Sequence, residues 1–269
     1  MSFQIAKPSA LLSPYIKHYW ALENCVSNGN EYTQRIVPSG LMELIFYLEE
    51  KPESLDPKKS IPENTCISGQ QKEFYDLTVK GRLSLFSVLF QPQGAMMFFN
   101  IPAKELYNQN VPLNNILKNQ VSKIESNLYE ANSFQDKINI IEKFMLQQLH
   151  KHHKLYEFKR ISNSISHINR LRGIANIEFL SNQACLSRKQ YERSFTEFIG
   201  TSPKQFLKIV RFQNTLNQKE KNKNYNLTQL AYNCGYYDQA HMINEFRQLS
   251  GMTPKQFFSE CESYSDYFQ

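Results

Sequence analysis

One segment of this chain of 269 residues occurs twice, and this repeat constrains the fold more than any other feature. The first copy runs from Phe195 to Phe206 and the second from Phe246 to Phe257, so that each anchor residue recurs 51 positions later. Both copies have a Gly, then a Ser or Thr, then an identical Pro-Lys-Gln-Phe end, at the same spacings. Such agreement indicates a duplicated structural unit.

Each copy predicts a helix, a turn, a second helix and a stop. In the first unit, Asn176 is expected to cap one helix and Ser187 the next, with Gln190 at the spacing of a capping box. Gly200 suits the left-handed residue that ends this second helix, and Pro203 suits the first turn of another helix. The corresponding residues of the second unit are Asn226, Gly235, Asp238, Gly251 and Thr253-Pro254, with Gln256 completing a capping box.

A long helix from Pro203 to about Lys219 is expected to connect the two units. A rigid connector would fix their relative placement. We call the second helix of each unit its reading helix. Two reading helices about 34 Å apart would then enter successive major-groove turns on one face of a DNA duplex.

The apolar stripes of the two reading helices leave a set of polar or small residues for contact with DNA. Arg and Lys pair well with guanine, whereas Gln and Asn suit adenine. The candidates for base contact are Lys189, Gln190, Arg193, Gln239, Ala240 and Asn244, and those for backbone contact are Ser187, Arg188, Lys204, Tyr237, His241 and Lys255. The alternatives are a solvated helix face for the first set, an interior His241 bonded to a backbone carbonyl, and packing of Tyr236 or Tyr237 in the turn.

The net charge of +6 is concentrated in the same region. Residues 155–262 contain 15 Lys and Arg against 9 Asp and Glu, whereas residues 1–154 contain 16 against 15. A neutral half joined to a basic half favours a polyanion as partner of the basic half, although an ordinary solvated basic surface is the alternative.

Residues 158–260 resemble the DNA-binding domain of AraC-family transcription regulators. The motifs that carry the resemblance run from Leu186 to Phe195, from Gly200 to Phe206, from Gly235 to Phe246, and from Gly251 to Pro254. The resemblance implies seven helices with two helix-turn-helix motifs, and it places the family's base-facing positions on the six base-contact candidates above. Departures from the family pattern are Lys189 and Asn244, where Arg is commoner, and Tyr191, where Leu is usual.

The first hundred residues are typical of a β-rich domain, with short apolar runs between Gly and Pro turns. A helical pattern then continues to about His150. The expected fold class is α+β: a small N-terminal β-barrel with helices over residues 1–152, and an all-α domain over residues 155–262. The N-terminal half resembles a cupin-like domain of unknown function found ahead of such DNA-binding domains, in Pro38-Ser39-Gly40, Gly69-Gln70-Gln71 and Phe90–Ala95. By analogy it would bind an effector or mediate dimerisation.

The segment from Lys151 to Lys154 is the candidate linker, and a flexible linker would let the two halves fold and act separately.

The neighbouring run His150-Lys151-His152-His153 could suggest a metal site, but a polar run without converging ligands favours solvent exposure, so no metal and no cofactor are expected. Some relatives of the DNA-binding domain are fused to repair enzymes with a reactive cysteine. Cys185 and Cys234 instead occupy positions that favour small buried apolar residues.

An apolar row in the β-rich half could line a small-molecule pocket, although such a row is more often simply core. Its members are Met42, Leu44, Phe46, Leu48, Leu85 and Phe90.

The absence of a long apolar run, of a signal-peptide pattern and of paired cysteines favours a cytoplasmic protein. The hypothesis is a transcription regulator with double-stranded DNA and RNA polymerase as partners, a small-molecule effector or homodimer contact in the N-terminal half, and no membrane partner. The rivals are an enzyme or ligand carrier, and an anti-regulator that binds protein through its basic face.

Overall fold

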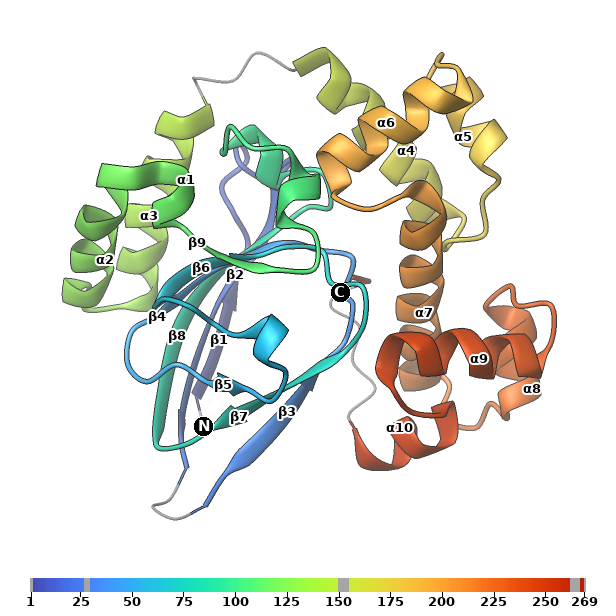
Figure 1. Cartoon of the computed structure of the whole chain (residues 1–269), viewed down its shortest axis with the longest axis horizontal. Helices are drawn as coiled ribbons and strands as arrows, with labels where there is room; N and C mark the ends of the chain where they lie inside the picture. The colour runs from blue at the N-terminus through green and yellow to red at the C-terminus, as the bar shows by residue number, and fades with distance from the viewer. Residues whose placement is uncertain (1, 27–29, 150–154, 262–266, 269) are drawn as a thin grey trace.

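The N-terminal half forms two antiparallel sheets in the computed structural model, which describes residues 2–26, 30–149, 155–261 and 267–268 (Figure 1). The larger sheet has the strand order β1-β2-β8-β4-β6-β9 and the smaller one the order β3-β7-β5. The strands are β1 (Ser2–Ala6), β2 (Ile16–Cys25), β3 (Tyr32–Ile36), β4 (Glu43–Tyr47), β5 (Glu53–Ser54), β6 (Thr65–Ser68), β7 (Tyr75–Val79), β8 (Arg82–Phe90) and β9 (Asn110–Pro112). The sheets face each other without closing into one barrel, so the predicted β-barrel is an open one.

The two faces of the larger sheet pack against different partners, because successive side chains of a strand point to opposite faces. On β4, Leu44 and Phe46 lie in one core cluster together with Phe86 of β8. Tyr47 lies on the other face, in a second cluster that includes Tyr75 of the smaller sheet. The central strands β4 and β8 are therefore buried on both faces.

Helices cover the first of these faces. They are α1 (Asn114–Leu117), α2 (Val121–Glu130) and α3 (Phe134–Leu149). The N-terminal half also contains the short 3-10 turns η1 (Pro57–Lys59), η2 (Ala95–Met97), η3 (Ala103–Leu106) and η4 (Lys118–Gln120). The ring of Phe134 at the start of α3 contacts that of Phe86, with centroids 5.9 Å apart. The predicted amphipathic helix before His150 is confirmed as α3.

Residues 155–261 form seven helices, as the resemblance implies. They are α4 (Leu155–Arg170), α5 (Ile177–Gln183), α6 (Arg188–Ile199), α7 (Pro203–Lys221), α8 (Leu227–Asn233), α9 (Gln239–Ser250) and α10 (Pro254–Glu260). No helix in the described part of the chain is both long and apolar enough to cross a membrane.

The two halves share one apolar core. A single cluster of buried residues continues from the β-sheet into α4, α6 and α7. Within it, the rings of Tyr15 and Phe158 lie 5.0 Å apart across the boundary. Tyr267, near the C-terminus, is also buried in this cluster, and its backbone oxygen accepts a hydrogen bond of 2.7 Å from Lys17. The candidate linker, Lys151–Lys154, lies outside the described residues.

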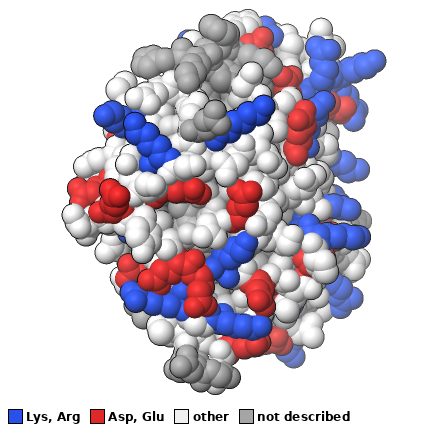
Figure 2. Space-filling model, turned by 60° about the vertical axis from the view of Figure 1, so that its left-hand side comes forward, with Lys and Arg blue, Asp and Glu red and all other residues white. Residues whose placement is uncertain are grey.

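The surface of the N-terminal side carries charges of both signs. Figure 2 brings this side forward and shows acidic and basic side chains intermixed across the middle of the view, with Lys and Arg gathered along its right-hand edge. This mixture agrees with the near-neutral composition of residues 1–154. It makes this side of the molecule a poor surface for a polyanion.

Candidate nucleic-acid interface

The first helix-turn-helix motif consists of α5, a turn and α6. Asn176 caps α5, because its side-chain oxygen accepts a hydrogen bond of 2.8 Å from the N–H of Glu178. Ser187 and Gln190 form a capping box at the start of α6: Ser187 Oγ accepts from the Gln190 N–H at 3.3 Å, and Gln190 Oε1 accepts from the Ser187 N–H at 3.1 Å. Gly200 ends α6 with a φ of 91°. These predicted caps are confirmed.

The second motif, α8, a turn and α9, repeats this arrangement. Asn226 and Gln229 form the capping box of α8, with hydrogen bonds of 2.9 and 3.1 Å. Asp238 caps α9, since its carboxylate accepts a hydrogen bond of 2.7 Å from the N–H of His241. Gly251 ends α9 in the left-handed conformation, with a φ of 75°. The duplication seen in the sequence is therefore a duplication of structure.

Helix α7 connects the two motifs. Its 19 residues span about 28 Å at 1.5 Å per residue, which approaches one turn of duplex DNA. Ser202 caps its first turn, with a bond of 3.2 Å from the Gln205 N–H, and Pro203 occupies the first helical position. Its buried face, which includes Phe206 and Val210, packs in the core shared with the N-terminal half. The connector is thus held by packing along its length.

The first reading helix, α6, presents Lys189 and Arg193 to solvent as predicted. Gln190 is also exposed, but its Oε1 is engaged in the capping box. On the opposite side of the helix, Tyr191 is fully buried, and its hydroxyl lies 2.6 Å from Ser164 Oγ on α4. Burial raises the pKa of Tyr191 to about 12, so the hydroxyl stays protonated and able to donate. The Tyr at this position therefore adds a polar link to α4.

The candidates for backbone contact lie at exposed helix starts and in the turns. Lys204 and Lys255 are exposed in the first turns of α7 and α10, where free N–H groups favour a phosphate. Arg188 is exposed and forms an ion pair of 3.0 Å with Glu192. Tyr237 is 85% exposed, whereas Tyr236 is 3% exposed. The expectation that one of these tyrosines packs in the turn is confirmed.

The second reading helix, α9, presents a shorter set of side chains. Ala240 and Asn244 are exposed. Gln239 is half-buried, and its Oε1 accepts a hydrogen bond of 2.8 Å from Thr228 Oγ1 on α8. Part of the predicted reading surface is therefore used to hold the two helices of the motif together.

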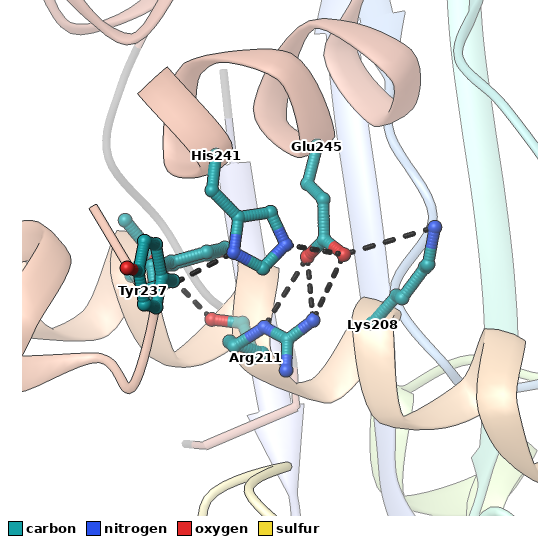
Figure 3. A network of polar contacts seen from close by, with 7 residues as sticks. Lys208, Arg211, Tyr237, His241 and Glu245 are labelled. Atoms are coloured by element: carbon teal, nitrogen blue, oxygen red, sulfur yellow. Dashed lines mark hydrogen bonds and ion pairs between the residues drawn. The ribbon is translucent and has the colours of Figure 1, made fainter. Parts of the chain in front are cut away.

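A buried carboxylate attaches this helix to the connector (Figure 3). Glu245 is 6% exposed and accepts hydrogen bonds of 2.6 and 2.9 Å from Arg211 Nη2 and of 3.2 Å from Arg211 Nε. Lys208 Nζ lies 3.7 Å from the same carboxylate. Arg211 also lies over the ring of Tyr236, 5.0 Å from its centroid. Sequence reasoning missed this pair, because nothing local relates a residue of α7 to one of α9.

His241 belongs to the same network. Its Nε2 lies 3.2 Å from Glu245 Oε1, and its Nδ1 accepts a hydrogen bond of 3.3 Å from the backbone N–H of Tyr237. Both ring nitrogens therefore have partners within the protein, and these bonds assign the proton to Nε2. The partner is a carboxylate and not the backbone carbonyl of the interior alternative. The sequence offered one signal for this contact, because His241 and Glu245 are four residues apart and therefore share one face of the helix. Contact of His241 with DNA stays a prediction.

The candidate effector-binding row is divided between the two faces of the larger sheet. Met42, Leu44, Phe46 and Phe90 are at most 1% exposed and lie in the core shared with the helices. Leu48 is half-buried against the same core. Leu85 lies in the other cluster, between the two sheets, so the six residues do not form one row. The reason is that Leu85 and Phe90 are five residues apart on β8, and the alternation of side chains along a strand places an odd separation on opposite faces.

Two surface pockets lie where the halves meet, and neither is lined by any of these six residues. One, of about 210 Å³, is lined by Lys72, Glu73, Gln205, Lys208, Glu245, Gln248 and Leu249. The other, of about 440 Å³, lies between α4 and the segments around Pro14 and Gln91. The first pocket adjoins the Glu245 network.

The cysteines differ in exposure. Cys234 is buried, as expected, and burial raises the pKa of its thiol to about 11. Cys185 is exposed, so the expectation of a small buried residue at this position was wrong. It lies in the tight turn itself, with a φ of 52°, outside the core.

Within the described ranges, no group of three or more His, Cys, Asp and Glu side chains converges as a metal site would require.

Comparison with known families divides the chain in the same way. Residues 180–260 match a family described as a helix-turn-helix domain, and residues 4–112 match a domain of unknown function, DUF6597. The HTH-type transcriptional regulator ArgR of Pseudomonas aeruginosa is 28% identical over 80 residues, which are 29% of this chain and 23% of ArgR. This chain thus matches about a quarter of the length of that curated relative.

Solved structures show similarity at low sequence identity. The DNA-binding domain of AdpA, in complex with a target DNA, aligns with 37% of this chain and 90% of its own, at 20% identity and a TM-score of 0.35. ToxT from Vibrio cholerae O395 aligns with 90% of this chain and 97% of its own, at 10% identity and a TM-score of 0.47.

Two capped reading helices joined by one rigid connector define a DNA-binding domain of the helix-turn-helix class. The C-terminal part of the chain contains a helix-turn-helix domain, as the two capped motifs and the family match over residues 180–260 agree.

Proposed function

We propose that this protein is a sequence-specific transcription regulator that reads two successive major-groove segments of double-stranded DNA. The observation that carries the proposal is the pair of duplicated motifs held by α7, whose length approaches one turn of the duplex. Contacts to phosphates would supply most of the affinity, and base contacts the specificity. Lys189, Gln190 and Arg193 would read bases from α6, and Gln239, Ala240 and Asn244 from α9.

The proposal extends to the N-terminal half. Its core is continuous with that of the DNA-binding domain, so a change of its shape on binding an effector or a second copy would reach the reading helices. RNA polymerase would be the partner through which the bound protein acts, in the cytoplasm. This role requires no catalytic activity and no cofactor.

The test is binding of the full chain to fragments selected from random duplex DNA, measured over a range of salt concentrations. We expect the logarithm of the affinity to fall linearly with the logarithm of the salt concentration, because phosphate contacts release counterions. We expect Arg193→Ala to weaken specific binding, while Arg82→Ala, which removes an exposed Arg from the N-terminal domain, leaves it unchanged. A flat salt dependence would contradict the proposal.

A further inference from the structure

The N-terminal domain contacts equivalent points of the two repeated units. Gly200 and Gly251 end the two reading helices and lie one repeat of 51 residues apart. A methyl group on Gly200 would lie 2.9 Å from the backbone oxygen of Ala103 and 3.4 Å from Met42 Cε. A methyl group on Gly251 would lie 2.3 Å from the ring of Phe74. All three contacting residues belong to the N-terminal domain.

The contact at the first unit is apolar. The short turn η3 packs against α6, and its residues Ala103 and Leu106 are fully buried. They lie in the same core cluster as Phe198 and Ile199 of the reading helix. The C-terminal end of α6 is therefore fixed to the N-terminal domain by packing.

The contact at the second unit is polar and aromatic. Arg35 on β3 donates a hydrogen bond of 3.3 Å from Nη1 to the backbone oxygen of Ser250, the last residue of α9. Asp76 on β7 holds the same guanidinium through two bonds of 2.8 Å, and the guanidinium lies 4.5 Å from the centroid of the Phe74 ring. A cation at this position also interacts favourably with the negative end of the helix dipole.

These contacts give the second reading helix two separate supports. The first is α7, on which α9 packs through the rings of Phe212 and Phe246, 4.8 Å apart, and to which the Arg211–Glu245 pair attaches it. A helix attached only there could pivot about the connector. The second is the Phe74–Arg35 contact at the far end of α9, which ties it to the same domain that holds α6. The path from α6 through the N-terminal domain to α9 closes a ring and resists this pivoting.

We propose that the N-terminal domain sets the separation and relative orientation of the two reading helices, with Phe74 and Arg35 as positioning residues for α9. This inference rests on the proposed reading of DNA by both helices. One base pair inserted between the two half-sites moves them apart by about 3.4 Å and rotates them by about 35°. A protein whose two reading helices are both fixed to the N-terminal domain should discriminate against such an insertion.

The experiment measures affinity of the full chain for duplexes in which the selected half-sites are separated by the preferred spacing, or by one or two base pairs more or fewer. We expect the wild-type protein to lose at least tenfold in affinity for each changed spacing. We expect Phe74→Ala to reduce this discrimination at least threefold. The matched control is Phe3→Ala, which removes an exposed Phe from β1 and should preserve the wild-type ratio. Phe74 is only half-buried, so its truncation leaves the core intact.

Three outcomes would overturn the inference or its foundation, and they are distinguishable. A wild-type protein that binds no duplex would remove the proposed function itself. Unchanged spacing discrimination in Phe74→Ala, with wild-type binding intact, would overturn the positioning role alone. An equal rise in affinity at all spacings would also overturn it, since the contact would then block DNA binding instead of orienting the helix.

A second pair of variants checks the contact by another route. Gly251→Ala places a methyl group against Phe74 and also strains the left-handed backbone. The backbone strain is the same in the Phe74→Ala background, whereas the clash is absent there. We therefore expect Gly251→Ala to change the ratio of affinities between the preferred and the altered spacings at least threefold in the wild-type background. In the Phe74→Ala background we expect less than half of this change. Equal effects in both backgrounds would show that the two residues do not act on each other.

Discussion

Replacing Arg211 by Met should destabilise the protein because it leaves a buried carboxylate without its main partner. Glu245 is 6% exposed and receives three hydrogen bonds from Arg211. Breaking a buried ion pair by removing one partner typically costs about 3–5 kcal/mol. Lys208 and His241 remain beside the carboxylate and offset part of this cost. We therefore expect Arg211→Met to lower the free energy of unfolding by about 2–3 kcal/mol.

The double variant Arg211→Met with Glu245→Met should recover most of that loss. Replacing both members of a buried pair by apolar side chains of similar volume is often neutral. We expect the double variant to lie within about 1 kcal/mol of the wild type, apart from the lost cation–π contact with Tyr236. The matched control is Arg188→Met, which breaks the exposed pair with Glu192 and should cost less than about 0.5 kcal/mol.

The assay is urea unfolding followed by two signals. Trp20 is the single Trp of the chain and reports on the N-terminal sheet, whereas far-ultraviolet circular dichroism reports mainly on the helices. The shared core predicts that the two transitions coincide, as two-state unfolding requires. A double variant as unstable as Arg211→Met would refute the argument from the unpaired carboxylate. Separate transitions would show that the shared core does not couple the halves.

Three further predictions concern binding, pH and thiol reactivity. Arg193→Ala should weaken specific DNA binding by about 1–3 kcal/mol, measured as the ratio of dissociation constants on the selected site, because one bidentate base contact is lost. Burial, with a smaller contribution from Lys17, lowers the pKa of His18 to about 4, so below pH 6.5 the unfolded chain binds a proton that the folded chain does not. Stability should therefore fall as the pH drops from 6.5 to 4, and His18→Asn should flatten this part of the urea-unfolding profile; an unchanged slope would contradict it. Exposed Cys185 should react with a thiol reagent in the folded protein, whereas Cys66 and Cys234, whose pKa values burial raises to about 12 and about 11, should react only after unfolding.

The features that the sequence predicts well are local ones. A capping box requires only two residues three positions apart, and those of Ser187 and Thr253 form as predicted. The glycines that end α6 and α9 need a positive φ, which an L-residue adopts with difficulty. Because the unit is repeated, each cap and each helix end is predicted twice. An error in one unit would show as a disagreement with the other. This is why the C-terminal domain was predicted almost helix by helix.

The features that sequence reasoning missed depend on contacts between distant segments. The apolar run of β8 has no polar residue to mark its two faces, but strand alternation by itself separates Leu85 from Phe90, and the placement of both in one row was wrong. The continuity of the core across both halves depends on packing between the sheet, η3 and α6, and no local pattern encodes it. Tyr267 follows residues 155–262, the predicted extent of the last domain, yet it lies buried in the core that the two halves share.

The two reading helices are anchored by different chemistry, and this difference bears on which of them reads more sequence. Helix α6 is held from behind by apolar packing and by the Tyr191–Ser164 hydrogen bond, so Lys189 and Arg193 stay free for DNA. Glu245 of α9 is the repeat equivalent of Ser194 of α6, 51 residues earlier. Its carboxylate forms ion pairs with Arg211 and His241.

Gln239 is likewise engaged with α8, which leaves Ala240 and Asn244 as the exposed part of the predicted base-contact set on α9. A methyl group and one short amide can make far fewer bidentate base contacts than Lys and Arg. We therefore expect changes of base in the half-site facing α6 to weaken binding more than changes in the half-site facing α9. In this view α9 contributes mainly by position, which is why the contacts that hold its two ends matter to what the protein binds.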